Sequence, residues 1–150
     1  MCGLSCLKNP KCSFGLLLRI SFGVSLLFMG LTHYMNLAGF VAMARDGMGA
    51  LEFVGVIWAY ILPALMILGG ALVAVGLFPE IGVAASAVAL GSIPVGMLAR
   101  PVLTGVSVTD VMPAAINAFI WLIVLFLVVK TMGCCCGGYC SEEGGSCCSK

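Results

Sequence analysis

The chain has 150 residues, of which 62% are hydrophobic and only 9% are charged, and its formal net charge is +1. An average soluble domain is about a quarter charged, so the composition excludes a soluble fold of this size and indicates a membrane protein. The small net charge and the lack of a basic run also exclude a nucleic-acid-binding surface. The length fits one domain.

The first apolar segment, 14–35, is long enough to cross a bilayer. As a helix rising 1.5 Å per residue it spans about 33 Å. Lys8 and Lys11 precede it, as in a secretory signal peptide, but the run is longer than a usual signal core and no A-x-A-like cleavage site follows. We therefore expect this segment to stay as the first membrane helix.

Three further apolar segments follow, and each contains a proline with a positional meaning. Pro63 predicts a kink in the second helix, Pro94 a bend late in the third, and Pro113 suits the first turn of the fourth. The fold class is therefore an all-α membrane protein, with four transmembrane helices in an antiparallel bundle at about 14–35, 51–78, 81–98 and 111–129.

The connections between these segments differ in length. Phe78-Pro79-Glu80 predicts a tight turn that makes the second and third helices antiparallel neighbours. Residues 36–50 and 100–110 are predicted to be loops, with Thr109 or Asp110 capping the last helix. The chain thus divides into a cysteine-containing N-terminal segment (1–13), a transmembrane domain (14–130) and a Cys/Gly-rich tail (131–150).

Small residues are expected to hold the helices together, because lipid competes equally for apolar side chains. Gly23 and Gly30 lie seven residues apart in the first helix, and the second has glycines in heptad register. One face of the third helix gathers five small residues at alternating steps of three and four: Gly82, Ala85, Ala89, Ser92 and Gly96. This spacing predicts a compact left-handed bundle.

Orientation follows from the lysine and arginine distribution. Four spans place both termini and the Pro79 turn on one side, which carries five basic residues (Lys8, Lys11, Arg19, Lys130 and Lys150). The other side carries Arg45 and Arg100. This bias predicts an integral protein of the plasma membrane with both termini in the cytoplasm.

Two stretches resemble the DoxX family of small four-helix membrane proteins. The first is LLLRISFGVSLLFMGLTHYMNLAGF, with an arginine near its start, two glycines, and a polar residue at its end (Arg19, Gly23, Gly30, and His33 or Tyr34). The second is ILPALMILGGALVAVGLFPEIGVAAS, which resembles the glycine-rich second helix, tight turn and alanine-rich third helix of that family.

This resemblance covers about 16–128 and implies a membrane protein linked to quinone-dependent sulfur oxidation or to a redox complex. The chain departs from the family in three places. Leu62-Pro63-Ala64-Leu65 stands where members commonly carry a glutamate, His33 stands where a lysine is common, and the cysteine-containing ends lie outside the pattern.

Three residues are the candidates for cofactor binding: His33, Tyr34 and Arg19. A histidine at this depth can bind a quinone carbonyl or relay a proton, and its alternative role is an interfacial residue bonded to a neighbouring helix. Arg19 either snorkels to the headgroups, pairs with Glu80, or binds an anionic substrate or lipid phosphate. Tyr34 also fits an interfacial aromatic belt.

The remaining polar residues predict a solvated rim and interhelical contacts. Asn117 is expected to hydrogen-bond across the bundle. The charged residues at the outer face could ring a small cavity or simply cap the helix ends: Arg45, Asp46, Glu52, Arg100 and Asp110. No nucleophile motif, phosphate loop or haem attachment motif is present, and whether the protein is an enzyme stays open.

All nine cysteines lie near the two ends of the chain: Cys2, Cys6, Cys12, Cys134, Cys135, Cys136, Cys140, Cys147 and Cys148. Since four spans bring both ends to one face, they form a candidate joint metal site for zinc or an iron–sulfur cluster. Acylation next to the last helix and free thiols are the alternatives, and disulfides require the opposite orientation.

We therefore predict a DoxX-like membrane protein that is an accessory or quinone-facing subunit of a redox assembly. Its cysteine tails would bind metal and connect it to a membrane or soluble redox partner. The alternatives are a non-enzymatic scaffold with acylated or free tails, and a small transporter. Besides the lipid bilayer, a second copy of the chain is a candidate partner, and nucleic acid is not.

Overall fold

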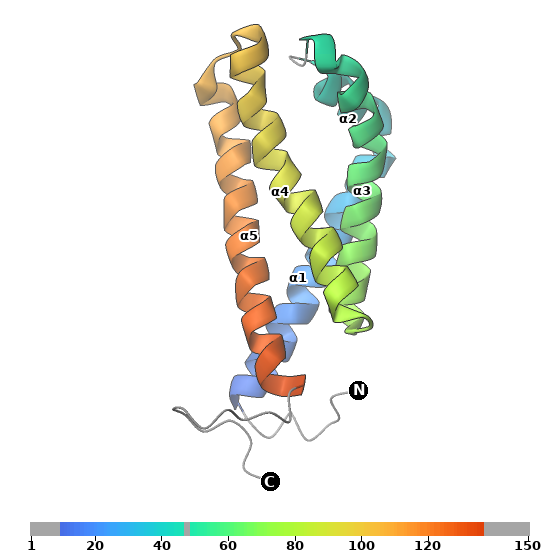
Figure 1. Ribbon diagram of the computed structural model, residues 1–150. Coiled ribbons are helices and arrows are strands. Elements are labelled where there is room, and N and C mark those ends of the chain that lie inside the picture. Colours follow the sequence, from blue (N-terminus) through green and yellow to red (C-terminus); the bar gives the residue numbers. More distant parts are fainter. Residues whose placement is uncertain (1–9, 47–48, 137–150) are drawn as a thin grey trace.

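The computed structural model describes residues 10–46 and 49–136, and this part of the chain is almost entirely helical (Figure 1). The elements follow in the order α1 (Pro10–Met35), α2 (Leu37–Arg45), a single 3-10 turn (Gly49–Leu51), α3 (Glu52–Val75), α4 (Pro79–Thr104) and α5 (Val108–Cys136). No strand occurs in the described ranges.

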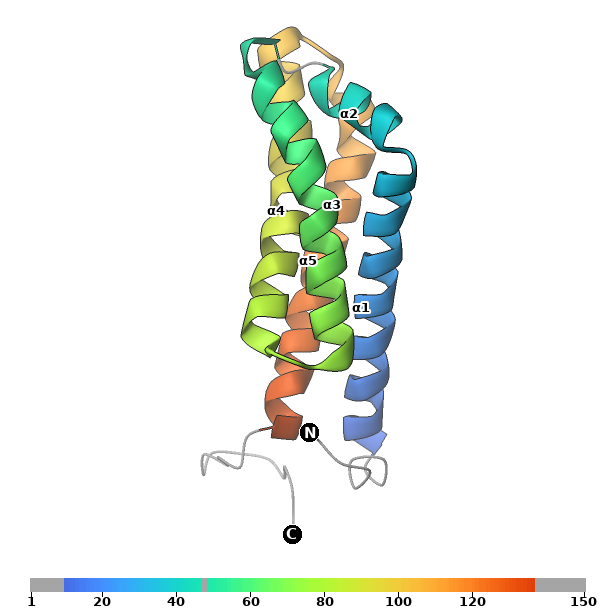
Figure 2. The ribbon, with the colours of Figure 1, turned by 90° about the vertical axis from the view of Figure 1, so that its right-hand side faces the viewer.

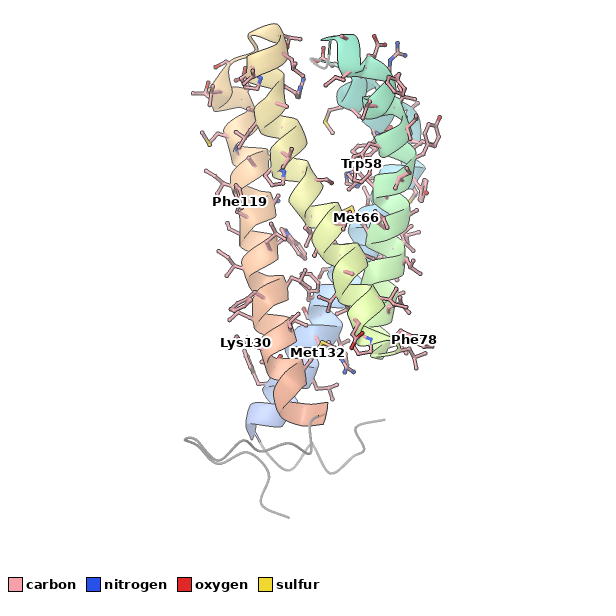
Figure 3. All side chains as sticks on the ribbon, in the orientation of Figure 1. Trp58, Met66, Phe78, Phe119, Lys130 and Met132 are labelled. Carbon is pink, nitrogen blue, oxygen red and sulfur yellow. The ribbon has the colours of Figure 1, made fainter. Side chains whose placement is uncertain are left out.

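Four of the helices are long and apolar enough to cross a membrane, which confirms the predicted all-α membrane fold and its four spans. The candidate spans are Ser13–Met35, Gly49–Val75, Pro79–Thr104 and Val108–Met132. Large apolar side chains cover their outer surface, as lipid contact requires. Figure 3 shows one of them, Phe119, pointing away from the bundle on α5.

The predicted loop at 36–50 is wrong, because most of it forms the short helix α2. Half-buried residues recur along it with helical spacing: Leu37, Phe40, Val41 and Ala44. This apolar stripe packs mainly on α3. The glycines around it pointed to a loop, but the period of its apolar residues is that of a helix.

The predicted loop at 100–110 is also wrong, since α4 continues through Pro101 to Thr104. Gly105 then ends the helix with a left-handed φ of 72°, and its N–H donates to the carbonyl of Pro101. Only residues 105–107 separate α4 from α5. Because α5 begins at Val108, it starts before both of its predicted caps.

The tight turn between α3 and α4 is confirmed. Gly76 ends α3 with a φ of 78°, Phe78 is also left-handed, and Pro79 opens α4 at its first turn. α3 and α4 are therefore antiparallel neighbours (Figure 2). We call this end of the bundle the turn end, and the opposite end the α2 end.

The start of α1 and the end of α5 meet at the turn end (Figure 1). Gly15 lies so close to Thr131 that an added Cβ would be 3.0 Å from the threonine Cβ. Farther along the same two helices, the rings of Phe22 and Trp121 pack with centroids 5.6 Å apart. The first and last of the four spans therefore have their outer ends at the same end of the bundle.

α3 lies between α1 and α4, and two adjacent glycines permit this. A Cβ on Gly70 would lie 2.5 Å from the backbone oxygen of Gly23 on α1. A Cβ on Gly69 would lie 2.5 Å from the hydroxyl of Ser86 on α4. The predicted role of small residues is therefore present at both interfaces.

The face of α4 that carries small residues is tightly packed at one end of the helix and open at the other. Near the turn end, Gly82 packs against Leu72 and Val73, and Ala89 is fully buried. Near the α2 end, a Cβ on Gly96 would have no neighbour within 4 Å. Figure 1 shows why, since α4 leans away from α3 as it approaches this end. The space left between them is the candidate site.

Candidate functional site

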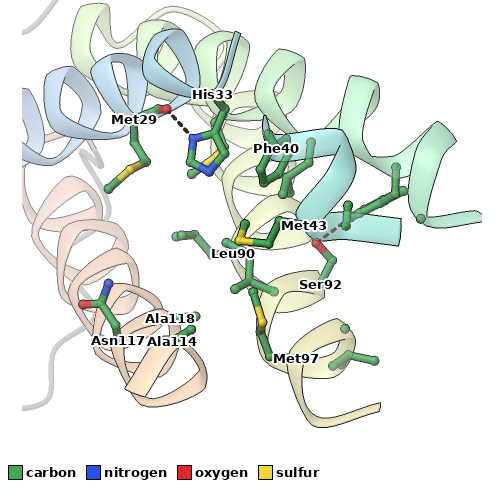
Figure 4. Close-up of a pocket in the computed structure, with 18 of the residues that line it drawn as sticks. Met29, His33, Phe40, Met43, Leu90, Ser92, Met97, Ala114, Asn117 and Ala118 are labelled. Carbon is green, nitrogen blue, oxygen red and sulfur yellow. Dashed lines mark hydrogen bonds between the residues drawn. The ribbon is translucent and has the colours of Figure 1, made fainter. Parts of the chain in front are cut away.

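A cavity of about 560 Å³ occupies the α2 half of the bundle, between all five α-helices (Figure 4). Its walls are mostly apolar side chains and small residues, among them Gly55, Leu90, Ala114 and Ala118. Ligand-binding cavities commonly have volumes of roughly 300–1,000 Å³ and such a lining. The cavity is partly open to the surroundings.

His33 is placed in the cavity wall near the end of α1. Its Nδ1 lies 2.6 Å from the carbonyl oxygen of Met29, one turn earlier in the helix. Its ring also meets the ring of Phe40 edge-on, with centroids 4.3 Å apart. Figure 4 shows the imidazole between Met29 and Phe40, pointing into the cavity. These two contacts hold the ring in place, and Nε2 makes no hydrogen bond within the described chain.

Methionines from four different helices line the same cavity: Met29, Met43, Met66 and Met97. Thioether side chains are flexible and polarizable, and they adapt to the shape of an apolar partner. In Figure 3, Met66 projects from α3 toward α4. The lining is therefore suited to an apolar ligand whose outline can vary.

Trp58 and Ser92 tie α3 to α4 across the cavity wall. The indole Nε1 donates to the serine hydroxyl at 3.0 Å, and that hydroxyl donates to the carbonyl of Ala89 at 2.8 Å. Both partners line the cavity, as does Trp121 from α5. The chain contains two tryptophans in all, so both of them border this space.

Arg100 lines the cavity toward the α2 end and is held by an ion pair. Its Nη2 donates to Asp46 at 2.7 Å, where the arginine side chain is 16% exposed and the aspartate 75%. Its Nε is buried without a partner in the described part of the chain. The pair joins the end of α2 to α4, and Arg100 brings a positively charged side chain to the cavity wall.

The predicted charged rim is partly a set of ion pairs. Beside Arg100 and Asp46, Arg45 pairs with Glu52, and both side chains of that second pair are about half exposed. Asp110 is exposed near the start of α5. Of these rim residues, only Arg100 lines the cavity.

The three predicted cofactor-binding residues do not come together. His33 lines the cavity, but Tyr34 points elsewhere and donates to the carbonyl of Tyr60 on α3 at 3.0 Å. Arg19 lies at the turn end, with its guanidinium against Gly76. In the described chain Arg19 makes no ion pair with Glu80, and its buried Nε has no hydrogen-bond partner.

The hydrogen bond of Tyr34 lies beside the proline of α3. Pro63 has no N–H to offer to α3, which weakens backbone bonding in the preceding turn. The carbonyl that loses its helical donor is that of Ala59, and the hydroxyl of Tyr34 donates to the next carbonyl, that of Tyr60, which adds an interhelical bond beside the proline. Asn117, by contrast, makes no hydrogen bond within the described ranges and lies exposed at the cavity margin.

The cysteine site mostly lies outside the described residues. Cys2, Cys6, Cys140, Cys147 and Cys148 fall beyond them, while the backbone of Cys12 belongs to α1 and that of 134–136 to α5. Both helices have these ends at the turn end (Figure 1). Within the described ranges no group of three His, Cys, Asp or Glu side chains could hold a metal ion.

Sequence reasoning missed most of the cavity lining. Phe40, Met43 and Ala44 come from α2, which was predicted as a loop. A count of apolar residues at helical spacing in 37–44 would have found it. The methionines gave a weaker signal, because nothing in their spacing along the chain shows that four helices bring them together.

Comparisons with known proteins add no relative. No family model, no curated protein and no solved structure matches this chain. The resemblance to the DoxX family has no support from these comparisons and stays a prediction.

Proposed function

We propose that this integral membrane protein binds a lipophilic molecule of the quinone class in the cavity of its α2 half. The observation that carries the proposal is the cavity itself, an apolar space of about 560 Å³ with His33 in its wall. A quinone has an apolar ring and tail with two oxygens, and its binding needs this combination of apolar lining and few polar groups.

The wider role proposed for the protein is that of an accessory, quinone-facing subunit of a membrane redox assembly. Its support is the cavity and the polar residue at membrane depth, since such residues commonly mark functional sites. We also propose that the termini are cytoplasmic in a plasma membrane, from the distribution of basic residues. The cysteine tails would then lie together in a reducing compartment, where thiolates are available for a metal.

A direct test uses the two tryptophans, because both border the cavity. A bound quinone is an electron-accepting ring and should quench their fluorescence. We would titrate a decyl-benzoquinone into the protein in lipid nanodiscs, with nanodiscs containing a non-cavity tryptophan peptide to correct for quenching by partitioned quinone. The expected result is saturable quenching beyond this background.

Gly96 and Gly91 provide matched variants on α4. Neither would bring a Cβ within 4 Å of another residue, but Gly96 lines the cavity and Gly91 does not. Gly96→Leu should fill the cavity and weaken binding at least about tenfold, as bulk introduced into a fitted site does. Gly91→Leu should bind like the wild type. Equal binding by both variants, or no saturable quenching in the wild type, would refute the proposal.

A further inference from the structure

The hydrogen bond from His33 to Met29 determines which ring nitrogen carries the hydrogen and which one is left for a ligand. The carbonyl oxygen of Met29 can only accept, so Nδ1 carries the hydrogen in the 2.6 Å contact. In a neutral imidazole the other nitrogen, Nε2, then has a lone pair and no hydrogen. His33 therefore offers the cavity a hydrogen-bond acceptor.

This acceptor distinguishes the two redox forms of a quinone-class ring. The carbonyl oxygen of a quinone also has only lone pairs, so placing it against Nε2 leaves both groups without a hydrogen. The hydroxyl of a quinol donates to Nε2. Discrimination of this kind is effective because a polar group of the site is left unpaired when the wrong ligand is bound.

Arg100 is compatible with the same ligand form. A guanidinium can only donate, and a hydroxyl oxygen accepts as well as donates. A quinol can therefore donate to His33 and accept from Arg100 in the same cavity. A quinone can only accept, so it can pair with Arg100 but not with His33. Arg100 and His33 line the same space, from α4 and α1.

We infer that the cavity prefers the reduced, hydroxyl-bearing ring, with His33 Nε2 accepting from one ring hydroxyl. This inference rests on the proposed function, since it specifies which form of the quinone-class ligand the site takes. It concerns binding alone, and no electron or covalent bond moves in it.

The test compares three probes with the same decyl tail: the benzoquinol, the benzoquinone, and the dimethyl ether of the quinol, which has no hydroxyl donor. Binding would be measured by calorimetry in nanodiscs, without oxygen and at pH 8. Empty nanodiscs give the partitioning background. We expect the quinol to bind about five- to tenfold more tightly than either other probe, the worth of one hydrogen bond.

Two variants assign the preference to His33. His33→Phe keeps a ring beside Phe40 but has no acceptor, so it should lower quinol affinity to that of the quinone and leave quinone affinity nearly unchanged. His33→Gln has an amide oxygen that can still accept, and should retain part of the preference. The melting temperatures of both variants would be recorded to confirm that they fold.

The outcomes separate this inference from the proposed function. Equal affinities for the three probes, or a tighter quinone, would overturn the inference while the proposed function stood. A quinol preference that survives in His33→Phe would overturn the role of Nε2. If no probe binds the wild type above the empty-nanodisc background, the proposed function fails and the inference fails with it.

Discussion

Gly70→Ala should separate α1 from α3, and the structure indicates by how much. The added Cβ would lie 2.5 Å from the carbonyl oxygen of Gly23 and 2.7 Å from the backbone nitrogen of Leu27. Both neighbours are backbone atoms, so no side chain can rotate away. The shorter distance is about 1 Å below an ordinary contact, so the two helices would have to move apart by about that much. A gap of this size between the other facing atoms forfeits a quarter to a half of their van der Waals attraction.

The control is Gly91→Ala, on the helix surface where a Cβ meets nothing within 4 Å. Replacing glycine by alanine inside a helix gains about 1 kcal/mol of helix propensity in each variant. This gain cancels when the two variants are compared, so their difference isolates the clash. Overpacking of this kind costs about 1–3 kcal/mol, and we expect Gly70→Ala to be less stable than Gly91→Ala by that amount.

Stability would be measured in detergent or nanodiscs, by reversible unfolding where this can be reached and otherwise by the melting temperature. For a chain of this length the difference corresponds to a melting temperature lower by roughly 2–12 °C. If the two variants melt together, α1 and α3 do not approach each other at Gly70, and the packing described for this interface is wrong.

Three further predictions follow from single contacts and from the tails. Ser92→Ala leaves the indole N–H of Trp58 without its acceptor and should lower stability by about 1 kcal/mol, seen as a lower melting temperature. Tyr34→Phe removes one exposed bond to the Tyr60 carbonyl and should cost less, about 0.6 kcal/mol in the same assay; a larger loss than for Ser92→Ala would contradict this ranking. Protein purified without chelator or oxygen should contain zinc or iron, and less than about a tenth of an equivalent would exclude the cysteine metal site.

The number and order of the spans could be predicted because hydropathy decides them. Each of the four long apolar runs has to cross lipid as a helix, because every backbone polar group must be hydrogen-bonded within the segment. The helix ends were less predictable. Pro101 suggests a loop by soluble-protein rules, yet α4 passes through it and stops only at Gly105, whose positive φ ends the helix.

The candidate site was predictable only in part. His33 could be selected from the sequence because it is the one histidine and lies at the end of a span. Its neighbours could not, because the cavity depends on how far α3 and α4 diverge and on α2 covering the space. Tyr34 adjoins His33 in sequence but lies on another side of α1, where its hydroxyl reaches α3. Adjacent helical residues point about 100° apart, so adjacency is a poor guide to a shared site.

The small residues of α4 explain how one helix can be both tightly packed and part of a cavity. A small residue allows close approach where the neighbouring helix fits into the space that it leaves. Gly82 and Ser86 meet α3 at Leu72 and Gly69, and the helices close there. Toward the α2 end, a Cβ on Gly96 would meet nothing within 4 Å, and Gly96 lines the cavity together with Trp58 of α3. The same face that seals the turn end therefore leaves room at the α2 end. Gly96→Leu is therefore expected to weaken ligand binding without the loss of stability expected for Gly70→Ala.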